Sequence, residues 1–87
     1  MRQNHTALKN ISKTFVLAES KKTMMKLLSD LLTPAEIHDI HERILIMQEL
    51  YKGKPQREIA KKLGVSIAKV SRGSQVLQYG EGSFDPL

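Results

Sequence analysis

The chain contains no cysteine, which excludes several kinds of protein. Without thiols there is no disulfide scaffold, no cysteine nucleophile and no cysteine-based zinc finger. No segment approaches the roughly 18 apolar residues that a membrane span needs, and the opening residues MRQNHTALKN lack the apolar stretch of a signal peptide. Sequence repeats, low-complexity tracts and alternating β-branched residues are also absent. We therefore expect a soluble, cytoplasmic, all-α protein with no membrane partner.

With 87 residues, the chain is long enough for one small hydrophobic core and too short for two. We expect a single domain over residues 1–87. A core of this size stabilises a fold only weakly, and small chains without disulfides or metal ions often depend on a second subunit. A homodimer is therefore the expected form.

The net charge of +5 is concentrated in one part of the sequence. Six basic residues and one acidic residue lie between Lys54 and Tyr79, while the rest of the chain has eight of each. Such a segment would attract a polyanion such as DNA. The alternative is an ordinary solvated surface, because basic patches also occur on proteins that bind no nucleic acid.

Apolar residues recur at helical spacing in the first two thirds of the chain. We expect a first helix from Thr6 to Ala18, which Glu19 and Ser20 interrupt, and then a second helix. The apolar residues of the second helix, between Met24 and Leu32, cover a broad face that indicates burial on two sides. The third helix begins with Thr33 as its cap, followed by Glu36 three residues later. It ends at Gly53, because glycine readily takes the left-handed conformation that closes a helix.

Residues 56–77 match a helix-turn-helix, the two-helix unit that many proteins insert into the major groove of DNA. Ala60 suits the point where two helices cross, Gly64 suits the left-handed turn between them, and Ser66 suits the cap of the second helix. That second helix is short and basic, as a recognition helix requires. The expected DNA contacts are Gln56, Arg57, Lys61, Ser66, Ile67, Ala68, Lys69, Ser71, Arg72 and Gln75.

Three other interpretations of these residues stay open. The basic segment could be an αα-hairpin that only packs, or part of an adaptor whose apolar helices dock another protein. His38, His41 and Glu42 lie three and four residues apart on one helix and could ligate zinc. The sequence supplies no further cluster of metal ligands, so we expect neither a metal site nor an enzyme.

Several of the same residues resemble the tryptophan repressor family. The similarity is carried by Leu32-Thr33-Pro34, Arg43, Gln56-Arg57-Glu58 and Arg72-Gly73-Ser74, and it covers about Met24 to Leu77 with one deletion near Pro55. The Arg-Gly-Ser triplet with its upstream Thr-Pro is more specific than a general helix-turn-helix. The resemblance implies an intertwined homodimer whose residues 6–53 form the dimer and the ligand site. It also implies a repressor that binds double-stranded operator DNA with L-tryptophan as corepressor.

The resemblance further implies which residues hold this ligand. Thr33 corresponds to the threonine that contacts the ligand carboxylate, and Arg43 and Arg72 correspond to the arginines on either side of the indole ring. Guanidinium planes stack on aromatic faces and bind carboxylates through paired hydrogen bonds. Leu32 would offer a backbone carbonyl to the ligand ammonium, and Gly73 would leave room for the ring.

The sequence departs from the family at three places. Val76 replaces a serine whose hydroxyl contacts the ligand ammonium, and losing such a hydrogen bond would weaken binding by about 1.5–3 kcal/mol. Ala60 replaces a lysine that contacts DNA, so the target sequence can differ. After Gln78 a glycine-containing tail stands where the family has its last helix. Either other apolar residues compensate, or the dimer is weaker, or the sequence is cut short.

On the residues alone, Arg43 could equally be an exposed helix charge paired with Asp39 or Glu42, and Arg72 could be a phosphate contact. Taken together, the residues and the resemblance predict a sequence-specific DNA-binding repressor. Its activator is expected to be L-tryptophan or a related aromatic corepressor. The alternative is a ligand-independent helix-turn-helix regulator of the wider Trp-repressor-like group.

Overall fold

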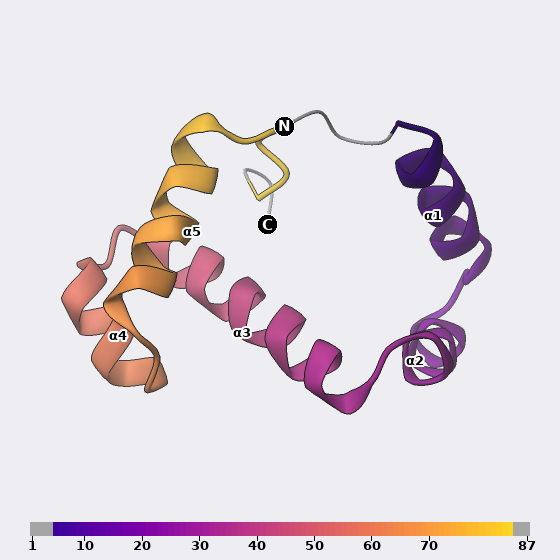
Figure 1. Cartoon of the computed structure of the whole chain (residues 1–87), viewed down its shortest axis with the longest axis horizontal. Helices are drawn as coiled ribbons and strands as arrows, with labels where there is room; N and C mark the ends of the chain where they lie inside the picture. The colour runs from indigo at the N-terminus through magenta and orange to yellow at the C-terminus, as the bar shows by residue number, and fades with distance from the viewer. Residues whose placement is uncertain (1–4, 85–87) are drawn as a thin grey trace. The chain divides into compact units, whose positions relative to one another are not determined.

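The computed structural model of the chain describes residues 5–84, and these residues form helices without any β-strand (Figure 1). The five helices are α1 (His5–Leu17), α2 (Lys21–Leu31), α3 (Pro34–Tyr51), α4 (Gln56–Leu63) and α5 (Ile67–Tyr79). The prediction of an all-α protein is confirmed. The chain divides into two compact units, residues 1–37 and residues 38–87, which we describe separately. No helix among the described residues is long and apolar enough to cross a membrane.

The first unit contains α1, α2 and the first turn of α3. Ser20 caps α2, because its hydroxyl accepts a hydrogen bond of 3.1 Å from the backbone N–H of Thr23. This cap starts α2 at Lys21, directly after the predicted interruption at Glu19 and Ser20. None of the residues of α1 and α2, all of which the structure describes, is buried. Large apolar side chains therefore remain in contact with solvent: Val16 is 75% and Leu17 78% exposed.

The start of α3 follows the predicted capping pattern. The backbone N–H of Glu36 donates to the Thr33 hydroxyl at 3.2 Å, and the backbone N–H of Thr33 donates to the Glu36 carboxylate at 2.8 Å. Two N–H groups that the helix itself leaves without acceptors are satisfied in this way. The other end of the helix is closed by Gly53, whose φ of 83° is the left-handed conformation expected there.

The second unit has its core where α3, α4 and α5 meet. Ile46, Ile59 and Val70, one from each helix, are almost completely buried. The half-buried side chains of Leu50, Ala60, Leu63 and Val65 pack around them. Burying apolar side chains from three helices at one point is the main force that holds these helices together.

The predicted turn between α4 and α5 is present. Gly64 has a φ of 67°, and the N–H of Val65 reaches the carbonyl of Ala60 at 3.0 Å. Ser66 then caps α5 by accepting from the N–H of Lys69 at 3.2 Å. The helix continues through Tyr79, which is the first residue of the predicted tail.

Candidate ligand pocket and basic surface

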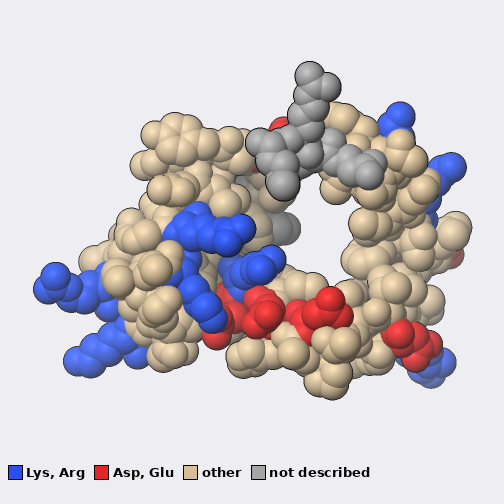
Figure 2. Space-filling model, in the orientation of Figure 1, with Lys and Arg blue, Asp and Glu red and all other residues tan. Residues whose placement is uncertain are grey.

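Lys and Arg side chains gather over α4 and α5 in the second unit, and Asp and Glu side chains lie beside them over α3 (Figure 2). Among the predicted DNA contacts, seven side chains are exposed to solvent without serving as a cap: Arg57, Lys61, Ile67, Ala68, Lys69, Arg72 and Gln75. Ser66 is also exposed, and its hydroxyl caps α5. All of these residues belong to α4, α5 or the turn between them, a segment with a surplus of positive charge.

Gln56 and Ser71 differ from the other predicted contacts because they bind each other. The Ser71 hydroxyl donates to the Gln56 side-chain oxygen at 2.8 Å, and both residues are half-buried. This hydrogen bond joins the start of α4 to the middle of α5. It therefore helps to set the angle between the two helices.

Lys69 on α5 forms an ion pair with Glu42 on α3. The ammonium group donates to one Glu42 carboxylate oxygen at 2.7 Å. This hydrogen bond and the attraction between the charges lower the pKa of Glu42 and raise the pKa of Lys69. This pair has no signal in the sequence, because its members are 27 residues apart. The pair attaches the first turn of α5 to α3.

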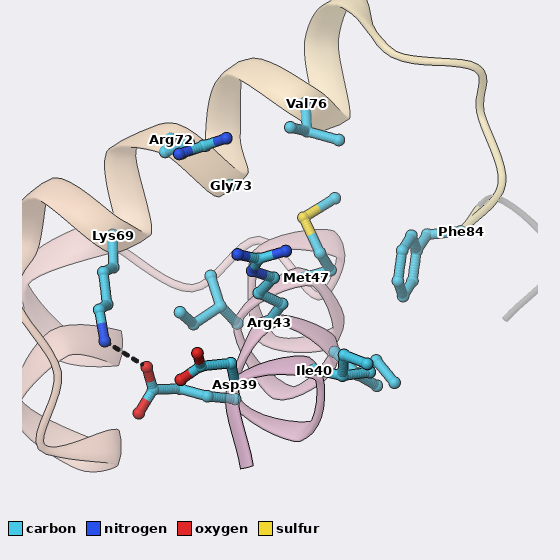
Figure 3. A pocket seen from close by; sticks show the side chains of 12 residues that line it. Asp39, Ile40, Arg43, Met47, Lys69, Arg72, Gly73, Val76 and Phe84 are labelled. Carbon is cyan, nitrogen blue, oxygen red and sulfur yellow. Dashed lines mark hydrogen bonds and ion pairs between the residues drawn. The ribbon is translucent and has the colours of Figure 1, made fainter. Parts of the chain in front are cut away.

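Between α3 and α5 lies a pocket of about 500 Å³ (Figure 3). Charged side chains line part of it: Asp39, Glu42, Arg43, Lys69 and Arg72. The remaining lining is apolar: Ile40, Ile44, Ile46, Met47, Gly73, Val76 and Phe84. A pocket of this size with a few charged groups and an apolar wall is suited to a small organic molecule.

The pocket brings together three of the five predicted ligand contacts. Arg43 comes from α3, and Arg72 and Gly73 come from α5. Leu32 and Thr33 belong to the first unit, where Leu32 ends α2 and the Thr33 hydroxyl caps α3. Their roles in ligand binding remain predictions.

Neither guanidinium group in the pocket has a carboxylate partner among the residues that the structure describes. Within residues 5–84, Arg43 and Arg72 form no ion pair with any carboxylate. The alternative pairing of Arg43 with Asp39 or Glu42 is therefore absent from the structure. Both guanidinium groups, with their planar arrays of N–H donors, are available to an anion.

Gly73 has a packing role in addition to its predicted place beside the ligand. A Cβ atom at this position would lie 2.9 Å from Cγ2 of Ile46 and 3.1 Å from Cδ1 of Leu50. Both distances are below normal carbon–carbon contact. The absence of a side chain thus lets α5 approach α3 closely at the pocket wall.

Other pocket residues were missed for two different reasons. Asp39 and Met47 lie four residues before and after Arg43, so helical spacing alone could have placed them on the same face. Phe84 lies in the segment after α5, where no periodic pattern gives a signal. Its place in the lining depends on the path of the chain after the helix.

The histidines of α3 do not form a metal site in the part of the chain that the structure describes. His38 Nε2 lies 3.6 Å from a Glu42 carboxylate oxygen. No group of three or more potential ligands is present among the described residues.

The comparisons with known proteins identify a regulatory class and not an enzymatic one. A family model described as Trp repressor protein matches residues 6–87. The chain therefore belongs to the Trp repressor family, a family of regulatory proteins for which tryptophan is in general the corepressor.

Individual relatives agree with this family. A protein named Trp operon repressor homolog from Xylella fastidiosa strain M23 is 40% identical over 73 residues, which are 83% of this chain and 79% of the relative. One from Chlamydia trachomatis serovar L2 is 39% identical over 67 residues, 76% of this chain and 71% of the relative. One from Vibrio campbellii is 45% identical over 53 residues, 60% of this chain and 53% of the relative.

Proposed function

We propose that the protein is a sequence-specific repressor of transcription that binds operator DNA through α4 and α5, which act as a helix-turn-helix. L-tryptophan or a related aromatic molecule in the pocket would activate it. The observation that carries this proposal is the position of Arg72, which lies on the exposed face of the proposed recognition helix and also lines the pocket. Arg72 thus belongs both to the proposed DNA-binding surface and to the pocket.

The DNA-binding part of the proposal is supported by shape and charge. The α4–α5 pair has the left-handed turn and helix cap of the motif, and its exposed side chains are mainly basic. Lysine and arginine residues would contact phosphates, while small residues at the start of α5, such as Ala68, would allow close approach to base edges.

The ligand-binding part is supported by the chemistry of the pocket. The guanidinium groups of Arg43 and Arg72 form no ion pair within residues 5–84, and they can stack on an aromatic ring or bind a carboxylate. The apolar lining would take up the ring. A ligand held between α3 and α5 would fix the orientation of α5 against the rest of the unit, and this would couple the pocket to DNA binding.

Dimerisation is supported by the first unit. Its two helices bury none of their residues within one chain, although both carry apolar faces. A second copy of the chain would cover these faces, and a homodimer would present two recognition helices to successive major grooves. A repressor of this kind would act in the cytoplasm on double-stranded DNA.

The DNA-binding claim can be tested with charge-removing variants. Arg57→Ala and Lys69→Ala should each weaken binding to a duplex selected from a randomised pool, because each removes a proposed contact. The expected loss is about tenfold for each variant, measured by fluorescence anisotropy. Lys26→Ala removes the same charge from α2 and is the matched control. Full affinity in the Arg57→Ala, Lys69→Ala double variant would contradict the proposal.

One observation favours a second candidate, a helix-turn-helix regulator that needs no ligand. Val76 contributes an apolar side chain to the pocket. A valine side chain cannot accept a hydrogen bond from a ligand. The two candidates differ in one measurable property. Tryptophan would raise the DNA affinity of a corepressor-dependent protein and leave that of a ligand-independent regulator unchanged.

A further inference from the structure

Two lysines of the proposed DNA-binding helices are bound to carboxylates of α3. Lys62 on α4 donates to Glu49 at 2.8 Å, and Lys69 on α5 donates to Glu42 at 2.7 Å. Figure 2 shows the acidic side chains over α3 beside the basic side chains over α4 and α5. Of the two lysines, Lys69 is the one that is proposed to contact DNA. The carboxylates of α3 thus neutralise part of the charge that would attract a polyanion.

The ion pair of Lys69 has one shielded partner and one open partner. The backbone of Lys69 is fixed in the first turn of α5, because its N–H donates to the Ser66 cap at 3.2 Å. Its side chain extends from α5 to the Glu42 carboxylate on α3 (Figure 3). The Glu42 side chain is 19% exposed, whereas that of Lys69 is 56% exposed. A phosphate group can therefore reach the ammonium group while Glu42 still holds it.

Both members of the pair are charged at neutral pH. Their hydrogen bond lowers the pKa of Glu42 and raises the pKa of Lys69. His38 lies 3.6 Å from the second carboxylate oxygen of Glu42, and Lys69 binds the first. The histidine and the lysine therefore do not compete for the same oxygen atom.

We propose that Glu42 competes with the phosphates of DNA for Lys69 and in this way lowers the DNA affinity of the free protein. This inference rests on the proposed DNA binding through α4 and α5. An ammonium group has three N–H donors, and Glu42 accepts one of them. A phosphate must either displace Glu42 or bind next to a carboxylate of the same charge sign. Each of these alternatives weakens binding to DNA.

The orientation of α5 does not depend on this pair alone. Val70 is completely buried in the core formed by α3, α4 and α5. The hydrogen bond between Gln56 and Ser71 also joins α4 to α5. Ion pairs with an exposed member contribute little to stability. Removing the charge of Glu42 is therefore expected to release Lys69 without displacing the helix. A pair that mainly positions α5 would have the opposite effect, because its loss would weaken DNA binding.

The experiment measures the DNA affinity of Glu42→Gln, which keeps the shape of the side chain and removes its charge. The dissociation constant for a duplex selected from a randomised pool is measured by fluorescence anisotropy, without added ligand and at a fixed low ionic strength. We expect Glu42→Gln to bind about threefold more tightly than the wild type. The gain should decrease at high salt, because ions screen the competing charges.

Asp39→Asn is the matched control. Asp39 is a second carboxylate of α3 whose charge acts on Lys69, but it forms no ion pair with Lys69 within residues 5–84. Its removal changes the net charge by the same amount as Glu42→Gln. The affinity of Asp39→Asn should rise by no more than about 1.5-fold. The difference between the two variants measures direct competition at Lys69 and not a general effect of charge.

A double variant tests whether the gain depends on Lys69. In a Lys69→Ala background, Glu42→Gln should change the affinity by no more than about 1.5-fold, because the contested ammonium group is absent. Glu42→Asp retains the charge but shortens the side chain by one carbon atom, so it should give a smaller gain than Glu42→Gln. Thermal unfolding establishes that each variant is folded. If Glu42→Gln were unfolded, Glu42→Asp would carry the test.

The outcomes separate this inference from the proposed function. Unchanged or weaker DNA binding by Glu42→Gln, equal gains for Glu42→Gln and Asp39→Asn, or the same gain in the absence of Lys69 would each overturn the competition. None of these results would affect the proposed DNA binding itself. If the wild type bound no duplex, with or without tryptophan, both the proposed function and the inference would be refuted.

Discussion

At the scale of single residues, Gly73 combines two requirements. It lines the pocket, and it lies where α5 comes closest to α3. The resemblance to the Trp repressor family suggested only that a glycine leaves room for a ligand ring. The structure adds that even one methyl group would collide with Ile46, which is buried.

Gly73→Ala is therefore expected to destabilise the protein. Alanine favours a helix over glycine by about 1 kcal/mol, but the crowding of a packed core costs about 1–3 kcal/mol. The Cγ2 atom of Ile46 lies on a branched, buried side chain and cannot move away easily. We expect a net loss of up to about 2 kcal/mol in chemical denaturation. Gln78→Ala, at an exposed position of the same helix, is the control; a stabilised Gly73→Ala would contradict the packing described.

At the scale of helices, Glu49 joins α3 to α4. One of its carboxylate oxygens accepts from Lys62 at 2.8 Å and the other accepts from Lys52 at 3.1 Å. These hydrogen bonds, first from Lys62 and then from Lys52, lower the pKa of Glu49 from 4.5 to about 2. A carboxyl group with a lowered pKa in the folded state stabilises the fold only while it is ionised.

The contribution of Glu49 is accordingly expected to depend on pH. It is fully present above pH 4.5, decreases as Glu49 becomes protonated, and is lost as the pH falls through about 2. Glu49→Gln should lower the melting temperature by a few degrees at neutral pH and show a smaller decrease toward acidic pH than the wild type. The melting curves, followed by circular dichroism, should converge near pH 2. A constant difference at all pH values would refute the role of the ion pairs, and Glu58→Gln is the control.

The helices and their ends were predictable because their signals are local. The Thr33 cap, the Gly53 end, the Gly64 turn and the Ser66 cap each depend on residues within one turn of chain, and all four are present. The break before α2 was predicted at Glu19 and Ser20, and the structure adds that Ser20 is the cap of this helix. Interactions between residues close in sequence were thus sufficient to predict the fold class and most helix boundaries.

The pocket was predictable only in part. Arg43, Arg72 and Gly73 were found through the family resemblance, whereas Asp39 and Phe84 carry no motif. The Glu42–Lys69 pair depends on the angle between α3 and α5, which follows from packing and not from any one segment. Contacts between distant segments can be predicted only when the three-dimensional arrangement of the helices is known.

At the scale of the whole molecule, the first unit leaves apolar side chains in contact with solvent. Its helices expose apolar side chains such as Ile11, which is 52% exposed, and a single chain does not bury them. Contiguous apolar surfaces of this kind are characteristic of protein–protein interfaces, and the proposed interface uses these side chains. The proposed homodimer explains this feature.

A charged substitution on that face should disrupt the dimer. Ile11→Glu places a carboxylate in the proposed interface, where it would lack a partner, and should raise the dimer dissociation constant at least about tenfold. Asn10→Glu adds the same group to the adjacent position as a control. Sedimentation equilibrium measures both. A wild-type protein that is monomeric at all concentrations, or an Ile11→Glu variant that dimerises like the wild type, would contradict the model.

The proposed regulator is tested most directly by its DNA affinity with and without ligand. The dissociation constant for a selected duplex is measured by fluorescence anisotropy in the absence and presence of millimolar L-tryptophan, at fixed ionic strength because phosphate contacts are salt-dependent. We predict that tryptophan tightens binding by about 5- to 150-fold, the usual range of coupling between two sites. Equal affinity with and without tryptophan would contradict the account.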